Sequence, residues 1–232
     1  MNARPAAHAT PGRPAASDRF NLACRDCPRL AAFLDQVRGD YPGYHARPVP
    51  AFGDTAAELL IVGLAPGMHG ANRTGRPFTG DHAGILLYRS LHQFGFASQG
   101  VSQAADDPLV LKNCRISNAV KCLPPQNKPL PEEIRCCNRY LAAELRRQPP
   151  RVILALGSVA HQAVLLACGL KRASRKFAHH AVHDLPALPG APAGMLLYDS
   201  YHCSRYNTQT RRLTEAMFHA VLRDVVAGLK SR

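Results

Sequence analysis

The sequence predicts a three-layer α/β/α sandwich with a central, mostly parallel four-stranded sheet. Three observations predict this fold: four short apolar runs, helical patterns between them, and loop-forming residues after each run. The four runs are Leu59–Val62, Cys114–Val120, Val152–Leu156 and Met195–Tyr198. Short apolar runs bounded by turn residues are typical of buried strands. Strands that alternate with helices favour a parallel sheet covered on both faces.

Four helices are expected between and after these strands. Apolar residues recur at helical spacing in each of them. The segment after Pro131 also begins with two glutamates, which are favoured in a first helical turn. The basic, histidine-rich segment Lys171–His183 is expected to be a surface loop. The predicted helices are Gly84–Phe94, Pro131–Arg146, Ser158–Cys168 and Thr214–Leu229.

Length and composition favour one globular domain over residues 21–232, preceded by a disordered tail over residues 1–20. The tail is rich in Ala, Pro and Arg and lacks the apolar segment of a secretory signal. No apolar run is long enough to span a bilayer, so a cytoplasmic protein with no membrane partner is expected. The formal net charge of +13 favours a nucleic-acid partner, the alternative being a basic protein with no polyanion partner.

The most informative segment is the glycine-rich loop that follows the first predicted strand, Gly63–Asp81. Ligands of open α/β sheets bind beyond the carboxyl ends of the strands, and glycines let the backbone approach them closely. Phe78 offers a flat face for stacking and Asp81 offers a carboxylate, which together suit a planar ring and chemistry beside it. Alternatively, Phe78 is a core residue and Asp81 caps the helix that follows.

The cysteines form a second candidate site. Cys24 and Cys27 are spaced as C-x2-C, and Cys122 and Cys137 supply a second pair. Four thiolates suit either zinc or an iron–sulfur cluster, and the spacing does not separate the two. Cys136 beside Cys137 leaves the fourth ligand ambiguous, and buried free cysteines are the alternative. The remaining cysteines are expected to be unpaired: Cys114, Cys168 and Cys203.

Five further segments, in order, extend these observations to a known family. Together with Cys24-x2-Cys27 they resemble the uracil-DNA glycosylase superfamily and, within it, family 5 (type B), from about Leu22 onward. The segment around Gly63 resembles the first motif of that family, and the one ending at Asp81 resembles its base-stacking and catalytic loop. The segments are Gly63–Gly67, Thr74–Asp81, Ser117–Cys122, Glu132–Cys137 and Ser200–Asn207.

The resemblance implies a role for each candidate residue. Asp81, His202 and Asn118 correspond to catalytic positions: Asp81 acts on water or stabilises the sugar cation, His202 donates toward the leaving base, and Asn118 contacts its edge. Phe78 would stack on the base. The alternatives are a core position for Phe78, a helix cap for Asp81, a turn or cap for Asn118 and a structural role for His202. The backbone of the first motif would contact the base or its phosphate, through Gly63, Leu64, Ala65, Pro66 and Gly67.

The last motif supplies the expected DNA contacts. Arg205 and Tyr206 lie in the loop that, in the resembling family, enters the minor groove, and Tyr206 is the candidate wedge. A wedge costs unstacking energy, about a few kcal/mol, which added contacts must offset. Further basic side chains are candidate phosphate contacts, with solvated surface charges as the alternative: Arg211, Arg212, Lys171, Arg172, Arg175 and Lys176.

For the cysteines, the resemblance implies a structural [4Fe–4S] cluster held by Cys24, Cys27, Cys122 and Cys137, with Cys137 favoured over Cys136. A brown protein would support iron, whereas a colourless protein with bound zinc would weaken the family assignment.

The implied activity is that of a monomeric, monofunctional DNA glycosylase. It would flip uracil, and also hypoxanthine, xanthine or ethenocytosine, from double-stranded DNA and hydrolyse the N-glycosidic bond. The resemblance places no lysine for a Schiff base, so no strand cleavage is expected. Two alternatives are a non-catalytic module for damaged or single-stranded DNA and a zinc-dependent deaminase. The deaminase signature, H-x-E followed by P-C-x-x-C, is absent.

Two positions depart from the superfamily pattern. The segment Gly63–Gly67 lacks the carboxylate or amide side chain that many members use to hold water, as in family 5 and unlike family 4. Cys203 follows His202 where the superfamily has His-Pro-Ser, which would make that loop more flexible.

Overall fold

The computed structural model describes residues 19–189 and 194–231, and its centre is a mixed sheet of six strands. The strand order is β1-β3-β2-β4-β6-β5, in which β3, β2, β4 and β6 run parallel to one another. The expected α/β fold with four central parallel strands is therefore confirmed. The strands are β1 (Phe52–Gly53), β2 (Leu59–Gly63), β3 (Cys114–Asn118), β4 (Val152–Leu156), β5 (Val182–Leu185) and β6 (Met195–Ser200).

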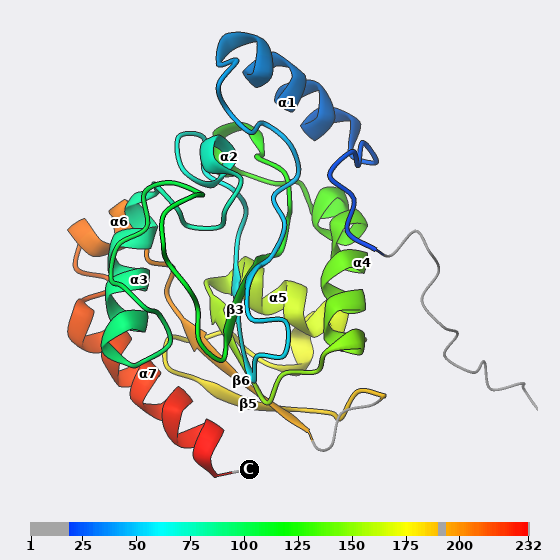
Figure 1. Ribbon diagram of the computed structural model, residues 1–232. Helices are drawn as coiled ribbons and strands as arrows, with labels where there is room; N and C mark the ends of the chain where they lie inside the picture. The colour runs from blue at the N-terminus through cyan, green and yellow to red at the C-terminus, as the bar shows by residue number, and fades with distance from the viewer. Residues whose placement is uncertain (1–18, 190–193, 232) are drawn as a thin grey trace, which may run out of the picture.

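The sheet carries an apolar core on each face, as expected for strands whose successive side chains alternate between the faces. In β2, Leu59 and Ile61 pack into one core, whereas Leu60 and Val62 pack into the other. The helices α3 and α7 cover the first face, and α4 and α5 cover the second (Figure 1). Burial on both faces explains why the central strands read as nearly continuous apolar runs.

The helices follow the sequence expectation at the four predicted segments, and the structure adds α1, α2 and α6. The added α1 lies at one end of the molecule, beyond the sheet, with α2 near the same end and α6 beside α3 (Figure 1). The helices are α1 (Pro28–Asp40), α2 (Ala71–Thr74), α3 (His82–Gln93), α4 (Pro131–Arg147), α5 (Ser158–Ala167), α6 (Arg205–Gln209) and α7 (Glu215–Lys230), with 3-10 turns η2 (Pro125–Asn127) and η3 (Arg172–Ser174).

Local sequence signals account for the helix ends. The side chain of Thr214 caps α7 by accepting from the Met217 amide at 3.2 Å. The side chain of Glu133 reaches back to the amide of Leu130 at 2.7 Å and fixes the start of α4.

Two expectations about the sheet edges were wrong. The sheet has six strands because β1 and β5 add antiparallel edges to the four central strands. The segment Lys171–His183 is not wholly a loop, since it contains η3 and the start of β5. Neither strand produces an apolar run in the sequence, because β5 contains polar residues such as His183 and β1 has only two residues.

The expected tail, residues 1–20, lies outside the described residues except for its last two positions. Of these, Phe20 packs edge-on against Tyr140, with ring centroids 5.7 Å apart. Among the helices that the structure describes, none combines the length and apolar character needed to cross a membrane.

Candidate active site

A cavity of about 410 Å³ opens beyond the carboxyl ends of β2 and β3. Its lining includes the first-motif residue Leu64, the ring of Phe78, the carboxylate of Asp81, the amide of Asn118 and the imidazole of His202. These residues come from the loop after β2, the end of β3 and the loop after β6, and the parallel sheet brings them together at one edge.

Strand register explains how Asn118 and Phe78 come together. Gly63 at the end of β2 lies directly beside Asn118 at the end of β3. A Cβ atom on Gly63 would lie 2.5 Å from Asn118 Oδ1 and 2.6 Å from the Phe78 ring, so only glycine permits this approach. Asn118 is 3% exposed, and its Oδ1 has no hydrogen-bond partner among the described residues. A buried, unpaired acceptor beside a cavity is expected to bind a ligand donor.

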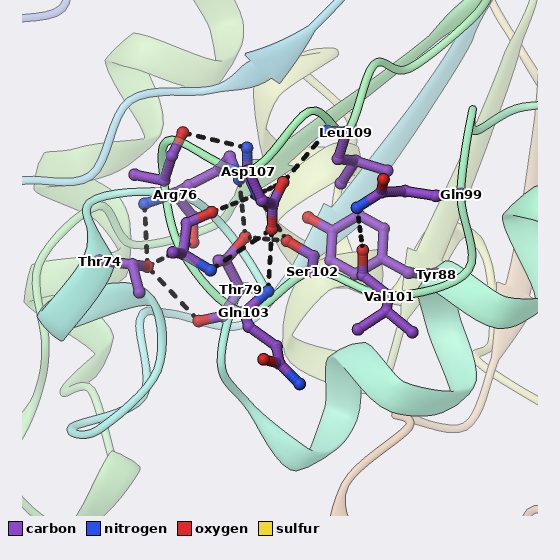
Figure 2. A network of polar contacts seen from close by, with 12 residues as sticks. Thr74, Arg76, Thr79, Tyr88, Gln99, Val101, Ser102, Gln103, Asp107 and Leu109 are labelled. Carbon is purple, nitrogen blue, oxygen red and sulfur yellow. Dashed lines mark hydrogen bonds and ion pairs between the residues drawn. The ribbon is translucent and has the colours of Figure 1, made fainter.

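The Phe78 backbone is held in an unusual conformation. Its φ of 57° lies in the left-handed region, which is unfavourable for a residue with a bulky side chain. The carbonyl of Pro77 accepts a hydrogen bond of 2.6 Å from the buried Tyr88 hydroxyl. On the other side, the hydroxyl of Thr79 lies 2.7 Å from that of Ser102 (Figure 2). Both neighbours of Phe78 are therefore fixed.

Arg76 completes this support from inside the protein. Its guanidinium pairs with Asp107 and donates to the carbonyl of Ala104 at 2.5 Å and the hydroxyl of Ser102 at 2.8 Å (Figure 2). Burial opposes ionisation of Asp107, but Arg76 and three backbone amides hold the pKa of its carboxyl below the usual value. We refer to Arg76, Thr79, Tyr88, Ser102 and Asp107 as the Phe78 clamp.

Asp81 precedes α3, where a helix cap is the alternative role, but its side chain accepts no hydrogen bond from that helix. Its carboxylate instead accepts from the amide of Ala71, the first residue of α2, at 3.1 Å. A Cβ atom on Gly70 would lie 1.9 Å from this carboxyl group, so the Asp81 side chain packs directly on the backbone of Gly70. Burial raises the pKa of Asp81, and the Ala71 amide opposes that rise only in part.

His202 lines the cavity from the loop that follows β6. Its ring stacks near that of Phe78, with centroids 5.9 Å apart and planes 29° apart. The side chain of Asn207 donates to the His202 carbonyl at 2.8 Å and fixes the loop, although Cys203 replaces the expected proline. Burial lowers the pKa of His202 to about 4, so the imidazole is neutral near neutral pH.

The structure gathers most of the expected site residues around this cavity. Leu64, Ala65, Gly67 and Arg205 line it with the residues described above, and Gly63 lies directly behind Asn118 and Phe78. Pro66 and Tyr206 are not in its lining, and Tyr206 is 68% exposed on α6, next to Arg205.

Sequence reasoning missed several residues of this region. His82, Ala83, Asn127 and Ser204 also line the cavity. For Asn127, the Pro-Pro run before it was a usable turn signal. The Phe78 clamp had no signal in the sequence, because its members come from separate segments of the chain and meet only in the folded protein.

The basic residues expected to contact phosphate have mixed surroundings. The guanidinium of Arg175 donates to the carbonyls of Ser174 and Asp184, and that of Arg212 lies over the Tyr201 ring. Lys171, Arg172 and Lys176 are exposed.

The cysteines meet in a second cavity between α1 and α4. Cys24, Cys27, Cys122, Cys136 and Cys137 all line it, and each is a free thiol in the described structure. The set therefore supplies one thiol more than four-thiolate ligation requires. Cys114, Cys168 and Cys203 lie elsewhere, also unpaired.

The surroundings of these thiols fit a thiolate-bound metal centre. The amide of Lys121 donates to Cys137 Sγ at 3.2 Å, and the guanidinium of Arg139 lies 3.8 Å from Cys24 Sγ. Donors to sulfur are typical around iron–sulfur clusters. Burial raises the pKa of Cys122 to about 12, a cost that coordination to a cation would offset.

The fold and the larger cavity define an α/β protein with an aromatic- and amide-lined binding site at the carboxyl ends of its parallel strands. Residues 50–226 match the family model described as the uracil DNA glycosylase superfamily. This match spans most of the described fold, including every residue that lines the larger cavity.

Curated relatives narrow this assignment. The chain is 48% identical to a type-5 uracil-DNA glycosylase of Thermus thermophilus, over 89% of this chain and 95% of the relative. It is 39% identical to a type-5 enzyme of Pyrobaculum aerophilum, over 88% of both chains. A type-4 enzyme of Archaeoglobus fulgidus is 34% identical over 61% of this chain and 58% of its own length. The chain therefore belongs to the uracil-DNA glycosylase superfamily and, within it, to the type-5 family.

Proposed function

We propose that this protein removes uracil from double-stranded DNA by hydrolysing the bond between the base and its deoxyribose. The product would be an abasic site, the starting point of base excision repair. The observation that carries the proposal is the buried, unpaired Asn118 Oδ1 in a cavity that also holds the Phe78 ring and the neutral His202.

The base must leave the duplex before it can enter this cavity, because the glycosidic bond is out of reach in a stacked helix. A mispaired uracil flips at least cost, which favours deaminated cytosine opposite guanine. The volume of about 410 Å³ falls within the range of small-ligand sites, so a single base fits. The Phe78 ring would stack on the base, and the clamp would hold that ring before the base arrives.

Asn118 would recognise the edge of the base. Its free Oδ1 can accept a hydrogen bond from the N–H group of uracil, while the amide nitrogen can donate to a carbonyl. The backbone of Leu64 lies alongside because its carbonyl accepts from the Val120 amide at 3.0 Å. This pairing supports the proposal that the first motif, Gly63–Gly67, lies against the base or its phosphate.

His202 would stabilise the leaving base. A neutral imidazole N–H can donate a hydrogen bond to O2 of uracil as negative charge develops on the leaving base. Preorganised donors of this kind are usually the largest single term in catalysis.

Asp81 would act on the attacking water and on the positive charge that develops on the sugar. Its carboxylate can position or deprotonate the attacking water and can stabilise the cationic sugar of the transition state. The raised pKa makes the ionised form a stronger base than an exposed aspartate, which suits proton abstraction.

The lining of the cavity supports a monofunctional enzyme with a broad substrate range. None of the described lysines lines it, and Lys121, the nearest in sequence to Asn118, is buried beside Ser117 and Glu144. A Schiff-base route with strand cleavage therefore lacks its nucleophile. Because stacking tolerates every base, we propose hypoxanthine, xanthine and ethenocytosine as further substrates.

Cys24, Cys27, Cys122 and Cys137 would hold a [4Fe–4S] cluster that joins the start of α1 to α4. When bound, the cluster would supply structural cross-linking only. Iron and sulfide analysis tests this, with about four irons per chain expected. Cys137→Ser should lose the iron and Cys136→Ser should keep it, and the reverse result would exchange these two residues.

DNA contacts are proposed for the surface around the cavity. Arg205 would bind a backbone phosphate and the exposed Tyr206 would enter the space left by the base. The net charge of +13 supports affinity for duplex DNA. We further propose a monomer that works in the cytoplasm with the chromosome.

The test is product analysis after incubation with a duplex that carries one uracil opposite guanine. Free uracil, together with strand breaks that form only after alkali, is the expected result. Binding without base release would leave a non-catalytic DNA-binding module as the better account. Breaks without alkali would contradict the monofunctional mechanism.

A further inference from the structure

A cluster of two imidazoles and a carboxylate lies outside the cavity and outside the cysteine site. His161 comes from α5, His183 from β5 and Asp199 from β6. Their side chains are 1%, 12% and 0% exposed, so all three are inside the protein. The sheet places His183 and Asp199 on the face that α5 covers, because both share that face with Leu197.

The carboxylate of Asp199 faces one imidazole with each oxygen. Oδ1 lies 2.8 Å from His161 Nδ1, and Oδ2 lies 3.1 Å from His183 Nε2. The three groups can each present a ligand atom within 4.8 Å of the others. No lysine or arginine forms an ion pair with Asp199 in the part of the chain that the structure describes.

The second nitrogen of His161 constrains the first. Nε2 lies 3.1 Å from the backbone carbonyl of Arg175, which can only accept, so Nε2 must carry a hydrogen. Nδ1 of the neutral ring then points a lone pair at a carboxylate oxygen. Two acceptors 2.8 Å apart require a positive charge between them, either a proton or a metal ion.

We propose that His161, His183 and Asp199 form a binding site for a divalent transition metal ion, with zinc as the best match. Two imidazoles and a carboxylate are a ligand set that zinc accepts, whereas calcium and magnesium prefer oxygen ligands alone. An imidazole that ligates through one nitrogen and donates to a backbone carbonyl through the other is the usual arrangement around such ions.

The ion would hold three elements together. It would join α5 and both strands of the β5–β6 edge at the point where β6 leads into the loop of His202, three residues after Asp199. None of the three ligands lines the larger cavity, so the ion would support the fold without contacting the base. This inference does not depend on the proposed function.

The alternative is a hydrogen-bonded network in which His161 carries the extra proton. Glutamine separates the two, because its amide group can still donate to Asp199 but is a poor zinc ligand. His183→Gln should therefore keep a hydrogen-bonded network and lose a metal site. His180→Gln is the matched control, since His180 is an exposed residue of the same segment that pairs with Asp224 instead.

The experiment uses the full-length protein with its cysteine site intact, incubated with zinc chloride and freed of unbound metal. Elemental analysis should find about one zinc per chain in the wild type and in His180→Gln, and none above background in His183→Gln. X-ray absorption at the zinc edge should show nitrogen and oxygen ligands at about 2.0–2.2 Å and no sulfur at about 2.3 Å. Equal zinc in wild type and His183→Gln, or a shell made of sulfur, would overturn the proposal.

Discussion

Asp81 illustrates a side chain whose ionised form is costly to the fold. The folded protein raises its pKa, so between the ordinary and the raised value the folded state binds more protons than the unfolded chain. Stability is then lost as pH rises through this window, and the whole cost is present once the pH exceeds the raised value. This cost is a common property of functional carboxylates.

We expect Asp81→Asn to unfold at a higher temperature than the wild type near neutral pH. The amide oxygen can still accept from Ala71, and no charge is buried. The difference should shrink below about pH 4, where the carboxyl is neutral in both states. Thermal melts at the two pH values test this, with the exposed Asp106→Asn as control. A variant that is less stable near neutral pH would contradict the pKa argument.

His202 has the opposite effect on the pH dependence of stability. Its folded-state pKa is lowered to about 4, so below about pH 6.5 the unfolded chain takes up a proton that the folded state refuses. Wild-type stability should therefore fall as pH drops from about 6.5 toward about 4. His202→Gln should show a flatter profile over this range in denaturant titrations. Parallel profiles for the two proteins would show that His202 is not buried as described.

At the scale of elements, the Asp81 carboxyl group packs against the backbone of the segment from Gly67 to the start of α2. Gly70→Ala would place a methyl group where the carboxyl now lies, and the flexible Asp81 side chain would turn away. We expect a large loss of base release. Gly39→Ala, with open space around the new methyl, is the control. In an Asp81→Ala background, Gly70→Ala should cause no further loss; an additional loss would place its effect elsewhere.

The Phe78 clamp predicts a second effect at this scale. Tyr88→Phe leaves the Pro77 carbonyl without its hydrogen bond, which should cost about 1–3 kcal/mol of unfolding free energy. The aromatic ring that packs in the core is retained. Because Phe78 then loses a restraint on its left-handed backbone, the rate constant for base release should fall more than DNA affinity. A slower rate explained entirely by weaker binding would contradict the clamp.

The sequence predicted the four central strands and four of the helices because these elements have strong local signals. The expected Cys114–Val120 strand ends at Asn118. The amides of Ala119 and Val120 donate to the carbonyls of Gly63, the last residue of β2, and Leu64, the residue after it. The edge strand β5 was missed because its four residues form no apolar run, and its His183 belongs to the buried cluster with Asp199. Such polar contacts depend on the tertiary fold, which periodicity does not reveal.

At the scale of the whole molecule, the sheet explains why a site scattered over the sequence becomes compact. Residues from Gly63 to His202 meet because parallel strands end at one edge, and this meeting was predictable once the strands were. The individual positions of Asp81, Asn118 and His202 followed from the family resemblance, and the structure places all three in the lining of one cavity. The clamp and the histidine cluster required the three-dimensional structure, because no local pattern connects their members.

The central claim is that the protein cleaves uracil from DNA in this cavity, and a His202 variant tests that claim most directly. The measurement is the single-turnover rate of uracil release from a duplex with uracil opposite guanine. We expect His202→Ala to lower this rate by about 100-fold or more, the usual cost of losing a donor to developing charge. The control His180→Ala should match the wild type. A His202→Ala rate within a few-fold of the wild type would contradict the account.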